Sequence, residues 1–349
     1  MILIKALKHI LKITVCIYTV YCLIFEFNII KKEVITALFL WANVIIPSVF
    51  PYLIISQYIS NSCFIEKIPL KIISFAFGIK KCSIKAVLCS EFCGYPSGAV
   101  CARNLYERGE IDIKEAQRLI CYTNNAGPLF LISAVGTSLL GSTKDGVVIY
   151  LIQLISSFIY GILKREKVNS CSKKKRQTNL EKSDFCSYVK NGVNICVNIC
   201  GFMVASYVMA SAMTIFIRNT FGNFANSFYV NAFVKGFFEI TAGINEFSSL
   251  NSEGLKFALI CGAVSWSGFS VIMQIKSVAG GLIDFKKLCS AKFIQALFSF
   301  VMGLIYKSFI CNGNRAPVKI IAMPISVVTA IIIFIFYLIY QSKKLSEKF

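Results

Sequence analysis

Four stretches of the sequence place polar or flexible residues inside runs that are otherwise apolar. They are Gly94-Tyr95-Pro96-Ser97-Gly98, Asn124-Asn125-Ala126-Gly127-Pro128, Glu239-Ile240-Thr241-Ala242-Gly243 and Ser265-Trp266-Ser267-Gly268-Phe269-Ser270. Proline lacks a backbone donor and glycine is conformationally free, so each stretch is expected to interrupt a helix. The half-helix that follows begins with unpaired N–H groups and a partial positive charge, which suit an anion such as a carboxylate. The four stretches therefore predict a binding site for a small polar or anionic molecule.

The side chains expected to contact this molecule lie within the four stretches or about one helical turn beyond them. The predicted substrate-binding residues are Pro96, Ser97, Gly98, Asn124, Asn125, Gly127, Thr241, Gly243, Ser267, Gly268 and Gln274. Each asparagine can donate and accept hydrogen bonds, which suits a small polar ligand or a coupling ion. The alternative interpretation is hydrogen bonding between helices at interfaces of small residues, and it applies above all to each serine or threonine taken singly.

Glu239 is the charged residue with the sharpest functional interpretation. A carboxylate inside an apolar stretch is costly unless it is paired, protonated or exposed to water, so we predict that Glu239 binds a coupling cation or proton. The alternative is a structural ion pair with Lys235, one helical turn earlier. Glu91 is a similar but weaker candidate, and Arg103 is expected either to attract an anion or to mark the membrane boundary.

The composition requires a membrane around these residues. The chain is 56% hydrophobic and only 15% charged, whereas an average soluble domain is about 25% charged. About 20 mostly apolar residues cross a bilayer, and we predict about eight such helices, at 13–30, 34–60, 119–141, 146–163, 188–217, 257–280, 288–306 and 320–341. The run 10–25 has the basic flank of a signal peptide but no cleavage site follows it, so it is expected to stay as the first helix.

Two further apolar stretches, 83–106 and 226–250, are interrupted and are predicted to be re-entrant hairpins. Irregular backbone at membrane depth is tolerated only where protein or a water-filled cavity surrounds it. The predicted fold class is thus an all-α polytopic membrane protein with two re-entrant hairpins. The short run 70–79 is expected to lie at the membrane interface, and Asp112 is expected to cap the helix that follows it, with Glu115 three residues on.

The sequence also contains a weak internal repeat. Residues 152–161 match residues 294–303 at five of ten positions, and the same offset of 142 aligns the first stretch with the third and the second with the fourth. With both ends cytoplasmic, the predicted inside segments carry 28 of the 37 Lys and Arg residues and the outside segments nine, as the positive-inside rule requires. The two halves are then inverted, which is typical of secondary transporters.

This topology divides the chain into five predicted parts. They are an N-terminal transmembrane helix (1–33), a first repeat (34–163), a basic cytoplasmic linker (164–187), a second repeat (188–306) and a C-terminal transmembrane helix with a basic tail (307–349). The linker could be a patch for nucleic acid or anionic lipid, but a solvated loop that enforces topology explains it, as positive-inside bias explains the net charge of +20. We expect the lipid bilayer as a partner and no nucleic acid.

The sequence predicts neither catalysis nor a cofactor. Fifteen cysteines lie mostly in apolar runs, and the chain has a single histidine, His9. Without a pattern of metal ligands or a nucleophile with its base, we predict no metal site, no cofactor and no enzyme.

The stretches 94–141, 239–247 and 265–278 resemble the sporulation integral membrane proteins of the YlbJ/SpoVV type. That family carries a nucleoside-recognition "gate" domain and is similar to concentrative nucleoside transporters; the resemblance covers about residues 35 to 306. This sequence departs from the family pattern at Val100, where a lysine is expected. It also departs at Ile272 and Met273, where a histidine and a small residue are common; these departures concern the details of substrate contact and not the fold.

The resemblance implies a transporter in the outer forespore membrane that moves dipicolinate, a small planar aromatic dicarboxylate, toward the forespore. The dianion would be compatible with the half-helix termini, although composition by itself does not indicate it. Two alternatives stay open at this point: a nucleoside or purine carrier, and a non-transporting membrane protein of spore-envelope assembly. The sequence leaves the oligomeric state undetermined.

Overall fold

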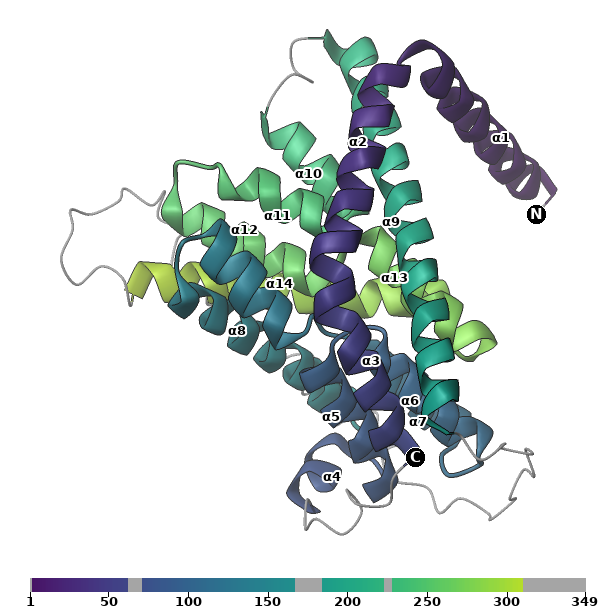
Figure 1. Ribbon diagram of the computed structural model, residues 1–349, viewed down its shortest axis with the longest axis vertical. Helices are drawn as coiled ribbons and strands as arrows, with labels where there is room; N and C mark the ends of the chain where they lie inside the picture. Colours follow the sequence, from purple (N-terminus) through teal and green to yellow (C-terminus); the bar gives the residue numbers. More distant parts are fainter. Residues whose placement is uncertain (1, 62–70, 167–183, 223–227, 310–349) are drawn as a thin grey trace.

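A computed structural model describes residues 2–61, 71–166, 184–222 and 228–309, and the regular structure within these ranges is entirely helical. The predicted C-terminal span 320–341 and most of the basic linker lie outside the described residues. The remaining chain contains two long helices and two groups of shorter ones (Figure 1).

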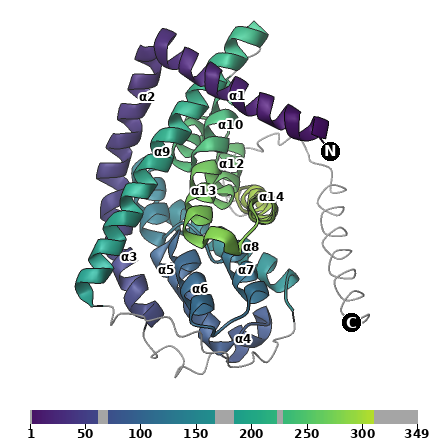
Figure 2. The ribbon, with the colours of Figure 1, turned by 90° about the vertical axis from the view of Figure 1, so that its right-hand side faces the viewer.

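The first long helix is continuous from Phe27 to Asn61. It consists of α2 (Phe27–Leu40), the π-helical turn η1 (Trp41–Ile45) and α3 (Ile46–Asn61). The second, α9 (Phe185–Phe221), has 37 residues and lies alongside the first (Figures 1 and 2). The N-terminal helix α1 (Ile2–Phe25) projects from the body of the molecule (Figure 1).

Side-chain hydrogen bonds to the backbone join the two long helices. Trp41 Nε1 donates to the carbonyl of Cys196 at 2.9 Å, and Gln57 Nε2 donates to the carbonyl of Tyr188 at 3.3 Å. Each bond uses a polar group that membrane lipid could not satisfy. The pair therefore forms a fixed frame against which the shorter helices pack.

The shorter helices form two groups with the same order of elements. The first group comprises α5 (Ile84–Cys93), α6 (Ser97–Glu107), α7 (Ile113–Tyr122), η4 (Phe130–Leu139) and α8 (Thr143–Leu163), preceded by α4 (Lys71–Phe77) and η3 (Lys81–Ser83). The second group comprises α10 (Phe228–Phe238), α11 (Ile240–Ser248), α12 (Glu253–Trp266), α13 (Gly268–Ala279), the short η6 (Gly280–Leu282) and α14 (Phe285–Phe309). In each group a broken helix is followed by a second broken helix and then by a long unbroken one.

Helix α14 docks the second group against the first; Figure 2 looks along it. Gln295 Nε2 on α14 donates to the carbonyl of Cys121 at 2.9 Å. Farther along, the hydroxyls of Ser265, Ser299 and Ser156 form a chain with O···O distances of 2.5 and 2.8 Å. Because α12, α14 and α8 supply one hydroxyl each, this serine chain ties the two groups together inside the core.

Within the described residues, five helical segments are long and apolar enough to cross a membrane, and they match five of the eight predicted spans. They are Phe27–Ile59, Thr143–Leu163, Phe185–Phe221, Glu253–Leu282 and Phe285–Ser308. The fourth, predicted over 257–280, is broken at Ser267.

Two predicted spans are wrong as single helices. The span predicted over 13–30 divides at Glu26, whose carboxylate lies 3.4 Å from Arg218 of α9. The boundary predicted between residues 33 and 34 lies inside α2. The span predicted over 119–141 divides at residues 123–127, because the asparagine and glycine residues there leave the helical path. The interrupted hairpins 83–106 and 226–250 do form broken helix pairs.

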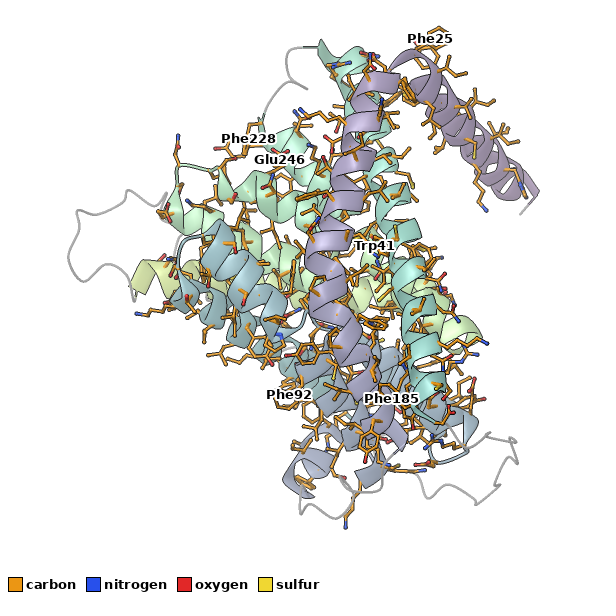
Figure 3. All side chains as sticks on the ribbon, viewed as in Figure 1. Phe25, Trp41, Phe92, Phe185, Phe228 and Glu246 are labelled. Atoms are coloured by element: carbon orange, nitrogen blue, oxygen red, sulfur yellow. The ribbon has the colours of Figure 1, made fainter. Side chains whose placement is uncertain are left out.

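The outward faces of the helices carry large apolar side chains. Phe25, Phe92 and Phe185, which are labelled in Figure 3, are each at least 60% exposed. A water-soluble protein of this size does not expose so many large apolar side chains in contiguous patches. The exposed faces fit contact with lipid, and the polar side chains are gathered inside.

A substitution at Gly98 tests how tightly the first broken helix is packed. A Cβ atom built on Gly98 of α6 would lie 1.4 Å from the carbonyl oxygen of Thr123, whereas one built on Gly201 of α9 would meet nothing within 4 Å. Gly98→Ala should therefore destabilise the protein by about 3 kcal/mol or more through overpacking. Gly201→Ala, the matched control, should stabilise it by roughly 0.5–1 kcal/mol, as expected for alanine in place of glycine in a helix. Thermal unfolding of the purified protein measures both, and equal behaviour of the two variants would contradict the packing described.

Candidate functional site

The two breaks of the first group meet through their backbones. The chain turns at Gly94, whose φ is +76°, and a Cβ atom there would lie 2.9 Å from the backbone nitrogen of Gly127 in the second break. Only glycine adopts this conformation without strain and permits the close approach. The sequence-predicted stretches 94–98 and 124–128 thus come together, as a single substrate site would require.

The two breaks of the second group meet in the same way. Ser267 and Gly268 both have a positive φ, and a Cβ atom on Gly268 would lie 2.8 Å from the nitrogen of Ile240 and 3.0 Å from Cα of Glu239. The third predicted stretch is interrupted at Glu239 alone, because Thr241 and Gly243 are already inside α11. Gly243 packs against the backbone of Gly236 on α10, so it closes the hairpin.

A small pocket opens between the first long helix and the breaks of the first group. Its lining residues are Ile45, Ser48, Val49 and Tyr52 of the long helix together with Cys93, Gly94, Tyr95, Gly127, Leu129 and Phe130. The chain is helical from Pro128, so the first turn of this half-helix, with its unpaired N–H groups, borders the pocket. Both π-helical segments, η1 and η4, contribute lining residues, and π-helical turns are frequent at functional sites.

Several predicted binding residues use their side chains for helix ends instead. Asn124 Oδ1 accepts from the backbone N–H of Ala99 at 3.1 Å and thereby caps α6, while its Nδ2 donates to the carbonyl of Ile120. Ser97 Oγ donates to carbonyl oxygens of Cys89 and Gly94. These side chains shape the break and are not free to bind a ligand in this conformation. Among the predicted residues, Gly127 borders the pocket.

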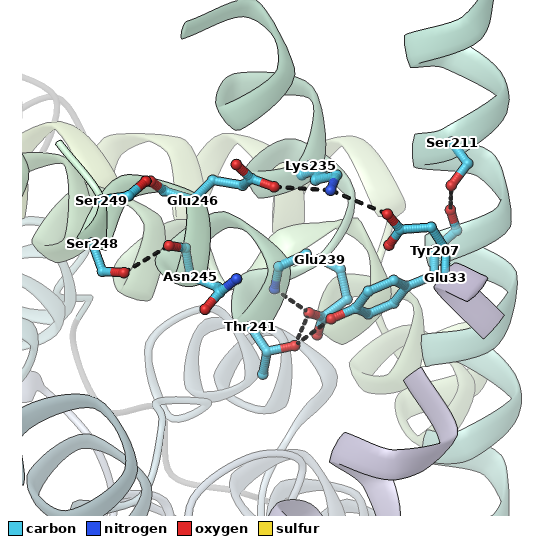
Figure 4. Close-up of polar contacts among 11 residues, drawn as sticks. Glu33, Tyr207, Ser211, Lys235, Glu239, Thr241, Asn245, Glu246, Ser248 and Ser249 are labelled. Carbon is cyan, nitrogen blue, oxygen red and sulfur yellow. Dashed lines mark hydrogen bonds and ion pairs between the residues drawn. The ribbon is translucent and has the colours of Figure 1, made fainter. Parts of the chain in front are cut away.

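Glu239 caps the half-helix that begins directly after it (Figure 4). Its Oε2 accepts from the backbone N–H of Ala242 at 2.9 Å and from the hydroxyl of Thr241, which in turn lies 3.1 Å from the hydroxyl of Tyr207 on α9. The positive N-terminal end of α11 is therefore already occupied by a carboxylate of the same chain. Since like charges repel, this terminus does not suit an anionic ligand.

The predicted alternative partner of Glu239 was Lys235, and that pairing is wrong. Lys235 Nζ instead contacts Glu246 Oε1 at 2.8 Å and Glu33 Oε1 of α2 at 3.2 Å (Figure 4). This ion trio joins both helices of the second hairpin to the first long helix. The pairing differs because Lys235 lies on a half-buried face of α10, whereas Glu239 turns inward beneath it.

The other predicted residues of the second group are buried near the break. Ser267 Oγ donates to the carbonyl of Val264 at 3.2 Å. Gln274 Nε2 donates to Ser270 Oγ at 3.1 Å, while its Oε1 has no hydrogen-bond partner among the described protein atoms. Both are at most 3% exposed, so the amide oxygen of Gln274 remains a candidate ligand-binding atom inside the core.

Asn125 belongs to a buried polar network of the first group. The two N–H groups of its Nδ2 are shared among three acceptors: Glu91 Oε1 at 3.0 Å, Ser157 Oγ at 3.1 Å and the carbonyl of Tyr122 at 3.3 Å. Glu91 is 6% exposed, and the hydroxyl of Tyr150 donates to its backbone carbonyl at 2.9 Å. Asn125 thus links the Glu91 carboxylate of α5 to the end of α7 and to α8.

Lys292 is the buried charge that the sequence reasoning missed. It lies on α14, is 0% exposed and donates from Nζ to the carbonyl of Asn124, within electrostatic range of Glu91. Counted from the sequence, Lys292 belonged to the basic residues of an inside segment, as did Lys85, which is 2% exposed. Its spacing in the sequence could have indicated burial, because Lys292 lies one helical turn before Gln295 and Ala296 and therefore on the same face of the apolar helix 285–309.

Charged residues at the ends of α6 and α7 serve to join helices. Asp112 Oδ1 accepts from the backbone N–H of Glu115 at 2.7 Å, which confirms the predicted cap. Arg103 is exposed, pairs with Glu107 at 2.7 Å and donates to the carbonyl of Val278 on α13 at 2.8 Å. This position fits a boundary residue that bridges the two groups. Among the described residues, no cluster of three or more His, Cys, Asp or Glu side chains could hold a metal ion.

Membrane-length apolar helices and broken helices whose polar groups are satisfied inside the protein define an all-α integral membrane protein. Among curated proteins, the chain is similar to the sporulation integral membrane protein YlbJ of Bacillus subtilis (strain 168). The two sequences are 21% identical in an alignment that covers 77% of this chain and 76% of the relative. The sequence matches no protein-family model, and no solved structure matches the chain.

Lys292→Met should reveal how strongly the buried charges depend on each other. The variant leaves the Asn124 carbonyl unpaired and removes the positive charge near Glu91, so we expect a loss of about 3 kcal/mol in unfolding free energy. Lys287→Met, an exposed position on the same helix, should change stability by no more than about 0.5 kcal/mol. Chemical unfolding in detergent measures these differences.

A double variant supplies the control for this interaction. If Lys292 offsets the charge of Glu91, then adding Glu91→Gln to Lys292→Met should recover at least about 1 kcal/mol. Strictly additive losses would show that the two side chains do not interact.

Proposed function

We propose that this protein is a transporter of the sporulating cell that carries dipicolinate across the outer forespore membrane into the developing spore by alternating access. The sporulation role rests on the similarity to YlbJ, whose name describes a sporulation integral membrane protein. The observation that carries the transport mechanism is the meeting of two helix breaks in each half of the chain, at Gly94 with Gly127 and at Glu239 with Gly268.

The matching element orders of the two groups support an inverted-repeat architecture. With an offset of 142, residues 97–107 of α6 correspond to 239–249, which contain α11, and residues 143–163 of α8 correspond to 285–305 of α14. Paired broken helices in inverted halves place their breaks near the bilayer midplane, where transporters bind their substrates. We therefore place the substrate between the first long helix and the breaks, and we place both chain ends in the cytoplasm.

The pocket suits one carboxylate and an aromatic ring. The first turn of the half-helix that begins at Pro128 offers N–H groups to an anion, whereas α6 and α11 have N-terminal groups already capped by Asn124 and Glu239. Tyr52, Tyr95 and Phe130 line the same pocket, and aromatic rings stack on a planar ligand ring. A small aromatic dicarboxylate presents both features; the pocket would have to widen to admit it, and further still for a nucleoside.

Uptake of radiolabelled dipicolinate into proteoliposomes tests this proposal. Tyr52→Ala should raise the half-saturating concentration about threefold to tenfold, because it removes one aromatic contact from the pocket. Tyr58→Ala is the matched control on the same helix, since Tyr58 is 66% exposed on the outward face, and it should leave uptake unchanged.

Three outcomes would contradict the proposal or part of it. Uptake that nucleosides or purines inhibit and dipicolinate does not would support a nucleoside carrier instead. Normal dipicolinate content in spores lacking the protein would favour an assembly role. Equal effects of the two tyrosine variants would place the substrate elsewhere.

A further inference from the structure

We propose that Glu91, held by Asn125, is a proton-binding site of this protein, and that Lys292 is its counter-charge. The proton would be the ligand, taken up by a carboxylate to give a carboxylic acid. The inference that this proton drives transport rests on the proposed function, whereas the binding of the proton does not. It differs from the sequence-based hypothesis, which assigned ion coupling to Glu239.

The geometry shows two acceptor atoms that lack a donor, on two side chains already in contact. Asn125 Nδ2 donates to Glu91 Oε1 at 3.0 Å, while Glu91 Oε2 and Asn125 Oδ1 have no hydrogen-bond partner among the described protein atoms. The orientation of the amide is fixed, because Nδ2 also donates to the carbonyl of Tyr122, which can only accept. Buried polar groups without partners are rare and costly.

A single proton on Glu91 supplies the missing donor. Protonated Oε2 can donate to Oδ1 of Asn125 while Oε1 continues to accept from Nδ2, which completes a cyclic acid–amide pair. A buried carboxyl is also less costly in the membrane when it is neutral than when it is charged. Glu239 differs, because its Oε2 accepts from Ala242 N–H and from the hydroxyl of Thr241, and neither of its carboxylate oxygens is a buried atom without a partner among the described residues.

The surroundings of Glu91 allow both protonation states. Lys292 from α14, Tyr122 from α7 and Tyr150 from α8 are the titratable groups that interact electrostatically with Glu91. Helices α3 and α6 approach α5 on another side, where the carbonyl of Ser56 and the thiol of Cys101 meet Cys89. With Glu91 ionised, the positive charge of Lys292 offsets it electrostatically; with Glu91 protonated, the acid gains a second hydrogen bond to Asn125.

The fixed ammonium also decides between a proton and a metal cation. A sodium ion at Glu91 and Asn125 would lie near the positive charge of Lys292, and the oxygen of Ser157 already receives an N–H from Asn125. A proton takes up almost no space and needs no oxygen ligands beyond the carboxylate, whereas a metal cation requires several.

The site is connected to the pocket through the chain itself. Cys93 and Gly94, which line the pocket, follow Glu91 on α5 and its end, and Gly127 lies two residues beyond Asn125. An anion in the pocket would strengthen proton binding at Glu91, and the bound proton would strengthen anion binding by the same factor. Carrying both together lowers the net charge that crosses the membrane.

Infrared spectroscopy of the purified full-length protein tests proton binding without any substrate. The wild type should show a C=O stretching band of a buried carboxylic acid that is lost as the pH is raised. Glu91→Gln should abolish this band and Glu239→Gln should retain it. Should Glu91→Gln not fold, Asn125→Ala should move the band to higher frequency, because the acid loses its amide partner. A wild type without the band, or a band that these variants leave unchanged, overturns the proposal.

Transport assays in proteoliposomes test the coupling. Glu91→Gln should lose accumulation of dipicolinate driven by a pH gradient, by at least tenfold, yet retain exchange of internal for external dipicolinate, which needs no net proton movement. Accumulation by Glu91→Gln at the wild-type level, or accumulation driven by a sodium gradient alone, overturns proton coupling at this site. If the wild type exchanges no dipicolinate at all, the proposed function fails, and the infrared result still decides whether Glu91 binds a proton.

Discussion

The structure depends on one constraint: a helix that breaks inside a membrane must find partners for its backbone groups within the protein. Three of the breaks are held by different solutions to that requirement. Asn124 satisfies the start of α6, Glu239 satisfies the start of α11, and the Lys292 ammonium satisfies a carbonyl in the break after α7. Glycines at the crossing points let two breaks share one small volume. The position of α14 follows, since it must bring Lys292 to that carbonyl.

Charge inside the core obeys a related rule. A buried ammonium and a buried carboxylate are each expensive alone, and together they are tolerated because each offsets the other. Glu91 and Lys292 come from opposite halves of the chain, so an electrostatic interaction links the halves in addition to their packing. The ion trio of Lys235, Glu33 and Glu246 lies elsewhere, at the contact with the long helix. Its side chains are only half buried, so they are partly accessible to water.

Sequence reasoning recovered the features that depend on local chemistry. Proline and glycine at 94–98 and the paired asparagines at 124 and 125 indicated breaks correctly, and hydropathy located five long apolar helices. It could not assign partners, since those depend on tertiary packing: Lys235 was expected beside Glu239, one turn away, but its acids come from α2 and α11. Lys292 escaped notice because a lysine at the end of an apolar run looks like a boundary residue. The split of 13–30 at Glu26 likewise depends on Arg218, which is remote in sequence.

The serine chain has a consequence for how the molecule can move. The hydroxyl of Ser299 on α14 is hydrogen-bonded to both Ser265 and Ser156. A shift of α14 by one residue along its axis would therefore break both hydrogen bonds at once. Together with the bond from Gln295 to the Cys121 carbonyl, this makes the two broken-helix groups a single rigid cassette. Relative motion is cheaper at the long helices, where fewer polar links must be exchanged. Any displacement between these parts would therefore keep the two groups together and occur where they contact the long helices.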